Sequence, residues 1–116
     1  SGTGISNLYQ RITKRKISGE EISKLAREGD INALKAWKEF TQALAYALSW
    51  TVNIVDPEVV IIGGSVMHSS DIFWDSMVSL FKKYICPQTA ASIQLKPAGL
   101  KDNAGFMGAA ALMFVE

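Results

Sequence analysis

The chain has 116 residues, of which 48% are hydrophobic and 20% are charged, and its formal net charge is +1. This size fits one domain, and this balance excludes wholesale disorder and the strongly basic footprint of a nucleic-acid-binding protein. The single cysteine, Cys86, excludes an intrachain disulfide and favours a reducing, cytoplasmic location. The longest apolar helical run, residues 43–55, is shorter than the ~20 residues of a membrane span, so we expect no membrane partner.

Two helices are expected at the start of the chain. Apolar residues recur at a helical spacing and predict a helix over residues 4–16. Ser18 and Glu21 form a capping box, in which the serine hydroxyl and the glutamate each accept a free backbone N–H. This predicts a second helix over residues 18–27, which Gly29 ends.

The third expected helix is the longest. Asp30 can cap its first turn, and Pro57 stops it. From Ala43 onward apolar residues cover both faces, so we expect this second half to be packed on more than one side. One apolar stripe marks the core face along the whole helix: Ile31, Leu34, Trp37, Phe40, Leu44, Leu48, Thr51, Val52 and Val55.

A buried strand and a Gly-Gly turn follow. Val59–Ile62 are four apolar β-branched residues in a row, a pattern that predicts a central parallel strand. Gly63 and Gly64 come next, and Ser65 follows them. Ligands of open α/β sheets lie beyond the carboxyl ends of the strands, and a residue without Cβ lets them approach the backbone. The turn is therefore either a plain tight turn or a binding edge.

The rest of the chain alternates between helix and strand. We expect a loop over residues 63–70, a helix over 71–84 capped by one of residues 69–71, a strand over 92–97 and a final helix over 104–114. Strands that alternate with helices indicate a parallel pair with a right-handed crossover. Two strands are too few for a stable sheet, so we expect other chain to complete it.

Several of these features recur together in one known family. The chain carries a Ser-Gly helix start at residues 1–4, Gly-Asp-x-x-Ala at 29–33, Pro-Glu at 57–58, the apolar strand with Gly63-Gly64, and Asn-Ala-Gly-Phe-Met-Gly-Ala-Ala at 103–110. In this combination it resembles the carboxy-terminal part of the ROK family, which comprises repressors, open reading frames and sugar kinases. These proteins belong to the actin-like ATPase superfamily.

The resemblance leaves one local alternative at the start of the chain. Gly2-Thr3-Gly4 is also similar to a phosphate-gripping turn found in the middle of these kinases. That turn lies between two strands, whereas residues 5–8 enter a helix here. We therefore interpret residues 1–4 as a helix start.

The resemblance implies an α/β fold. It is the actin-like ATPase (ribonuclease H-like) carboxy-terminal lobe, helix-rich with a few parallel strands, and residues 1–116 form a single domain of a longer ROK-type protein. It also implies that Gly63, Gly64 and Ser65 border the adenosine of ATP, which Mg²⁺ accompanies. These three residues are the candidate cofactor site.

The expected function follows from what the resemblance places outside this chain. The family's first phosphate loop, catalytic aspartate, sugar-binding Glu-x-Gly-His and zinc-binding cysteines all precede it. His68 and Cys86 are interpreted as structural or surface residues, so no catalytic residue and no metal site is predicted.

We therefore expect the nucleotide-side lobe of an ATP-dependent sugar kinase of the glucokinase or hexokinase type, inactive as an isolated fragment. Nucleotide is the expected partner, and sugar joins it only with the amino-terminal part. Two alternatives stay open: the sugar-sensing portion of a ROK-type repressor, or an α/β interaction domain without nucleotide chemistry. An exposed sheet edge favours a homo-oligomer.

Overall fold

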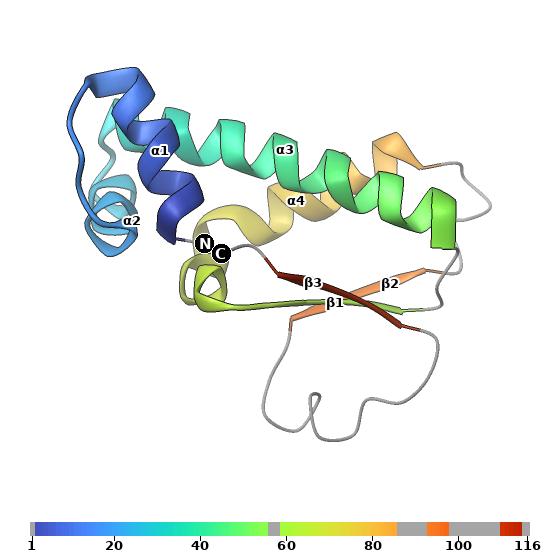
Figure 1. Cartoon of the computed structure of the whole chain (residues 1–116). Helices are drawn as coiled ribbons and strands as arrows, with labels where there is room; N and C mark the ends of the chain where they lie inside the picture. Colours follow the sequence, from blue (N-terminus) through green and yellow to red (C-terminus); the bar gives the residue numbers. More distant parts are fainter. Residues whose placement is uncertain (1, 56–58, 86–92, 98–109, 115–116) are drawn as a thin grey trace.

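A computed structural model describes residues 2–55, 59–85, 93–97 and 110–114. Helices α3 and α4 lie over one face of a small sheet, and α1 and α2 lie at the amino-terminal end of α3 (Figure 1). None of the described helices combines the length and the hydropathy that crossing a bilayer requires. In chain order the elements are α1 (Gly2–Thr13), α2 (Gly19–Arg27), α3 (Ile31–Val55), β1 (Val59–Gly63), the 3-10 helix η1 (Ser65–Ser69), α4 (Ser70–Tyr84), β2 (Gln94–Pro97) and β3 (Ala110–Phe114).

The capping residues fix the boundaries of α2 and α3 where the sequence predicts them. The Ser18 hydroxyl accepts the Glu21 amide at 3.2 Å, so α2 begins with one of its free donors satisfied. Gly29 has φ +92°, a conformation that ends a helix without a Cβ clash. Asp30 Oδ2 then accepts the Ala33 amide at 2.9 Å and starts α3.

Helix α1 is shorter at its end than the predicted 4–16. It stops at Thr13, because Lys14 has φ +65°, which is left-handed backbone. The Thr13 hydroxyl stabilises this exit: it donates to the Tyr9 carbonyl at 2.8 Å and accepts the Arg15 amide at 3.1 Å. The helix start at residue 2, in contrast, confirms the interpretation of residues 1–4.

The sheet has three parallel strands in the order β2-β1-β3. The predicted central strand is confirmed, since β1 pairs on both edges: Val60 lies opposite Leu95 of β2 and Ala111 of β3. The expectation that this chain supplies only two strands, and that a different segment or a second copy completes the sheet, is wrong. Residues 110–114 of this chain supply the third strand.

The predicted final helix is also wrong over these same residues. Residues 110–114 form β3, whereas residues 104–109 lie outside the described part of the chain. Ala-Ala-Leu-Met-Phe is a short apolar run, and such a run fits a strand buried on both faces as well as a helix. Pairing decides between them, because a helix here would leave one edge of β1 without hydrogen-bond partners.

The core lies between the sheet and the helices. Val60 and Ile62 of β1 are fully buried against α3 and α4, together with Phe73, Met77 and Phe81 of α4. From α3 the core takes Trp37, Phe40, Leu44, Leu48 and Val52 of the predicted stripe. The stripe is wrong at its start, since Ile31 is 79% exposed and Leu34 is 45% exposed.

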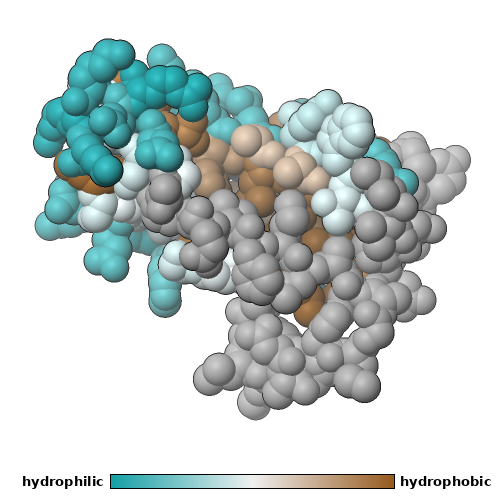
Figure 2. All heavy atoms as spheres, in the orientation of Figure 1, coloured by the Kyte–Doolittle hydropathy of each residue, from teal (hydrophilic) through white to brown (hydrophobic). Residues whose placement is uncertain are grey.

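Within the described part of the chain the second half of α3 packs on one side only, which corrects the prediction. Its outer face exposes Tyr46 and Trp50, whose rings contact each other at 6.2 Å between centroids. Tyr84 of α4 closes this aromatic patch with its ring 5.7 Å from that of Tyr46. The end formed by α1 and α2 is instead strongly hydrophilic (Figure 2).

Candidate functional site

The chain leaves the carboxyl end of β1 through a glycine whose backbone suits no other residue. Gly63 is buried at the end of the strand, and Gly64 follows with φ 99° and ψ 179°. That region of backbone space is essentially restricted to glycine. Ser65 then begins η1, so the predicted loop over 63–70 is a 3-10 helix followed at once by α4. Gly64 also closes the turn, because its carbonyl accepts the Met67 amide at 3.1 Å.

A cavity of about 380 Å³ opens beside this turn. One wall is the beginning of α2, with Ser18, Gly19 and Glu20, and the facing wall is η1, with Ser65 and His68. The space is large enough for a small organic ligand. It lies just beyond the carboxyl end of β1, where α/β sheets bind ligands.

One residue of the cavity lining, Trp37, carries a buried polar group without a partner in the described part of the chain. Trp37 lines the cavity and is only 3% exposed, and its Nε1 has no hydrogen-bond acceptor among the described residues. The indole ring itself is held rigidly, stacked on Phe73 with 5.7 Å between centroids and 2° between planes. A buried N–H without an acceptor costs about 1–3 kcal/mol. The Nε1 atom is closed to solvent, so a ligand would reach it only if neighbouring side chains move.

A second, larger groove lies between α3 and α4. It measures about 570 Å³ and includes Leu34, Lys38, Ile72 and Leu80. Its lining comes from the two helices, and no residue of the turn after β1 contributes to it. Trp37 lines this groove as well as the smaller cavity. We take the smaller cavity as the candidate site, because it lies just beyond the carboxyl end of β1, where α/β sheets bind ligands.

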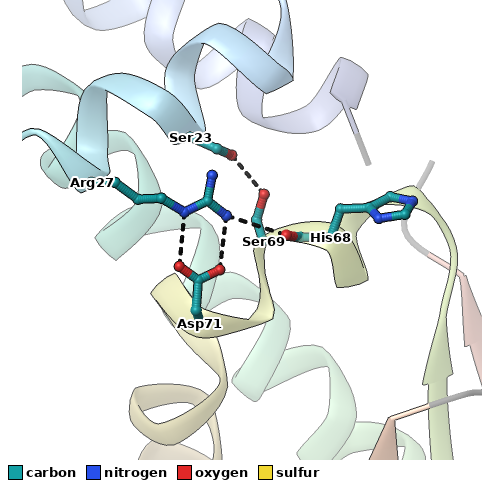
Figure 3. A network of polar contacts seen from close by, with 5 residues as sticks. All are labelled: Ser23, Arg27, His68, Ser69 and Asp71. Carbon is teal, nitrogen blue, oxygen red and sulfur yellow. Dashed lines mark hydrogen bonds and ion pairs between the residues drawn. The ribbon is translucent and has the colours of Figure 1, made fainter.

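Polar contacts from α2 hold the segment that carries Ser65 and His68 (Figure 3). Arg27 donates from Nε to Asp71 Oδ2 and from Nη2 to Asp71 Oδ1, both at 2.8 Å. Its Nη2 also donates to the His68 carbonyl oxygen at 3.2 Å. The hydrogen bond from Arg27 lowers the pKa of Asp71, and the same bond raises the pKa of Arg27.

This ion pair predicts a small loss of stability in acid. Because the pKa of Asp71 is lower in the folded state, the pair stabilises the fold above the ordinary aspartate pKa of about 3.9 and is lost as the pH falls through the folded value. Both side chains are exposed, at 44% and 59%, so the expected contribution is at most about 1 kcal/mol.

Urea unfolding of the wild-type chain and of Asp71→Asn at several pH values measures this contribution. The difference in unfolding free energy should be present at pH 7 and disappear in strong acid. A difference that stays constant from pH 7 to pH 2 would contradict the assignment.

The structure relates the predicted site residues to the cavity in different ways. Of the three, Ser65 lines it, whereas Gly63 and Gly64 set the turn that leads to Ser65. Sequence reasoning missed His68, interpreted as a structural or surface residue, and the start of α2. The Ser18 capping box predicted where α2 begins, but nothing in the sequence indicated that this end of α2 faces the Gly-Gly turn. Cys86 lies outside the described residues, within which no three His, Cys, Asp or Glu side chains group as metal ligands would.

The chain is similar to both kinases and repressors. It is 30% identical over 98 residues to a glucokinase of Thermotoga maritima, covering 84% of this chain and 31% of that protein. It is 28% identical over 100 residues to the xylose repressor of Bacillus spizizenii, covering 86% of this chain and 26% of that protein. The chain thus spans about a third of the length of the curated relatives it matches.

A solved structure supports the fold. The ROK family glucokinase of Streptomyces griseus, in complex with glucose and AMPPNP, superposes with a TM-score of 0.73 at 24% identity, over 94% of this chain and 41% of that one. The likeness places the chain in the α/β fold of ROK sugar kinases, the actin-like ATPase fold. The family profile described as "ROK family" matches residues 1–115. This chain therefore belongs to the ROK family.

Proposed function

We propose that the chain is the carboxy-terminal, nucleotide-side lobe of an ATP-dependent sugar kinase, and that adenosine binds in the cavity between α2 and η1. The observation that carries the proposal is the cavity at the end of β1, with the Gly63–Ser65 turn beside it and the Trp37 indole in its lining. A purine offers a flat face that can lie against a glycine backbone and against an aromatic side chain. The Streptomyces griseus glucokinase, solved with AMPPNP, supports the choice of nucleotide.

The beginning of α2 adds a second reason for this ligand. Helix N-termini carry free N–H groups and a partial positive charge, which favour oxygen-rich and anionic groups. Ser18 and Gly19 bring this end of the helix to the cavity wall, and Glu20 adds a carboxylate that can accept from ribose hydroxyls. Mg²⁺ would accompany the nucleotide phosphates, as it does in phosphoryl transfer generally, and the chain assigns no residue to hold it.

Titration of the ¹⁵N-labelled chain with ADP tests the proposal. We expect the amide signals of Ser65 and His68 and the indole N–H signal of Trp37 to shift at millimolar nucleotide. The indole of Trp50 is an internal control, because Trp50 lies in the exposed aromatic patch and does not line the cavity. Titration without any shift at millimolar ADP would contradict nucleotide binding and favour an interaction domain without nucleotide chemistry.

Catalysis by the isolated chain is not expected. Phosphoryl transfer depends on a positioned base and on charge stabilisation of the transferring group, and the family resemblance assigns both to segments outside these 116 residues. A coupled assay with ATP and glucose should show no turnover. Measurable glucose phosphorylation by this chain would refute its inactivity.

A sugar-responsive repressor is the second candidate, and the match to the xylose repressor of Bacillus spizizenii favours it. The net charge of +1 gives this chain no DNA-binding footprint, so the DNA-binding part would lie in another segment. Sequencing the DNA upstream of the segment that encodes this chain separates the two candidates. A helix-turn-helix there supports the repressor, and an Asp-x-Gly-x-Thr phosphate loop supports the kinase.

A further inference from the structure

The turn that forms one wall of the cavity has little structure of its own. η1 spans only Ser65–Ser69, and 3-10 helices of this length have strained hydrogen bonds and no independent stability. It follows Gly64, whose unusual backbone gives the chain a sharp change of direction. The position of Ser65 and His68 at the cavity must therefore be set by contacts with other elements.

Helix α2 supplies the polar contacts, 41 to 46 positions away in the sequence. Ser23 and Ser69 share a hydrogen bond of 2.6 Å, and both side chains are buried. Arg27 holds the carbonyl of His68 and the carboxylate of Asp71 with one guanidinium group (Figure 3). One side chain thus holds the last turn of η1 and the first turn of α4 together.

These contacts and the opposite cavity wall come from one face of the same helix. Gly19, Ser23 and Arg27 follow one another at intervals of four residues, which places them in a row along α2. Gly19 and Ser23 line the cavity, and Ser23 and Arg27 hold the segment that lines the other side. Two contacts therefore tie the walls together: the Ser23–Ser69 bond within the lining, and the Arg27 contacts one turn farther along α2.

We propose that Arg27 and Asp71 are positioning residues: their ion pair fixes η1 against α2 and holds the cavity at the width its ligand needs. The inference rests on the proposed function for the identity of that ligand, a nucleotide. Arginine suits this role because its planar fork bonds a carboxylate through two nitrogens and still reaches a carbonyl, which a lysine ammonium does not do in one geometry. Neither Arg27 nor Asp71 lines the cavity, so their effect on a ligand would act through η1.

Two measurements on the full chain test the proposal in Arg27→Ala, Asp71→Ala and the double variant. The first is hydrogen exchange of the Met67 amide without nucleotide, since this amide closes the turn onto Gly64. The second is the Kd for ADP. We expect exchange to accelerate and Kd to rise by about threefold to fivefold in each single variant, the loss of one partly exposed, charge-assisted contact. The double variant should change neither quantity beyond Arg27→Ala, because Arg27→Ala already removes both the ion pair and the bond to the His68 carbonyl.

Lys24→Ala and Asp75→Ala are the matched controls. They remove the same charges from exposed positions on α2 and α4 and leave the ion pair intact. Exchange and Kd should stay within about twofold of the wild-type values, the size of a surface charge effect. Equal effects in controls and test variants would overturn the proposal, because general charge loss would then explain them.

Two further outcomes are decisive. Unchanged Met67 exchange in Arg27→Ala overturns the positioning role, and faster exchange with an unchanged Kd overturns its link to the ligand. If the wild-type chain binds no ADP, the proposed function fails. The exchange comparison alone then decides whether the ion pair positions η1.

Discussion

Replacing Phe73 with alanine is expected to lower the free energy of unfolding by about 3–5 kcal/mol, the usual cost of removing a buried aromatic ring. Phe73 is fully buried at the junction of α4 with α3. Its ring stacks on Trp37, and it also packs edge-on against Phe40 at 6.3 Å between centroids. Its ring also contacts that of Trp74 at 6.4 Å between centroids. Truncation therefore removes a large apolar surface and three ring contacts, and it leaves a cavity that rigid neighbours fill poorly.

Trp74→Ala is the matched control for this prediction. Trp74 is the next residue on α4, but it is only half-buried. Removing its larger ring should therefore lower the unfolding free energy by less than removing the ring of Phe73. Urea unfolding followed by far-UV circular dichroism gives both values. Since domains of this kind are stable by about 5–15 kcal/mol, Phe73→Ala should unfold at far lower urea or fail to fold. A cost below that of Trp74→Ala would contradict the assignment of Phe73 to the core.

Signals close together in the sequence predicted the first half of the fold well. The boundaries of α2 and α3 follow from Ser18, Gly29 and Asp30, whose side chain or backbone acts within three residues of its own position. The central strand β1 was predicted equally well, because a strand buried on both faces forms a continuous apolar run without polar residues.

The second half depended on partners far along the chain. Residues 110–114 carry good helix formers, and only the unpaired edge of β1 turns them into a strand. The packing prediction for the second half of α3 was wrong around Tyr46 and Trp50 for a related reason. An apolar helix face indicates that another surface can cover it, but it does not indicate that this chain supplies that surface.

Sequence patterns singled out the turn beside the cavity but not the rest of the cavity lining. The turn could be identified from the sequence because a Gly-Gly directly after a buried strand is a local pattern, here Gly63 and Gly64 followed by Ser65. The opposite wall of the cavity could not be identified in this way, because α2 contacts η1 through Ser23 and Ser69, which are 46 positions apart. Serine and arginine on an exposed helix face usually contact only water, so no sequence signal separates Arg27 from its neighbours on α2.

Replacing Gly64 with alanine should separate the two things this glycine does. At φ 99° and ψ 179° a Cβ is strained, so we expect a loss of about 1–3 kcal/mol in unfolding free energy. If the structure instead relaxes, the turn moves and takes Ser65 with it. Either response should weaken ADP binding at least about tenfold, which equals about 1.4 kcal/mol of binding free energy.

Gly29→Ala isolates the backbone effect from the ligand effect. Gly29 also has a positive φ, at +92°, and a Cβ added there meets nothing within 4 Å. It lies after the end of α2, away from the residues that line the cavity. Gly29→Ala should lower the unfolding free energy by about 1–2 kcal/mol, because alanine is strained in left-handed backbone. The Kd for ADP should stay unchanged.

Chemical denaturation and ADP titration of both variants give the comparison. Comparable stability losses with weakened binding only in Gly64→Ala would show that this turn borders the nucleotide. Equal weakening in both variants would mean that general destabilisation lowers affinity. Unchanged binding in Gly64→Ala would remove the Gly63–Ser65 turn from the site, because a displaced or strained turn beside a bound purine cannot leave its affinity intact.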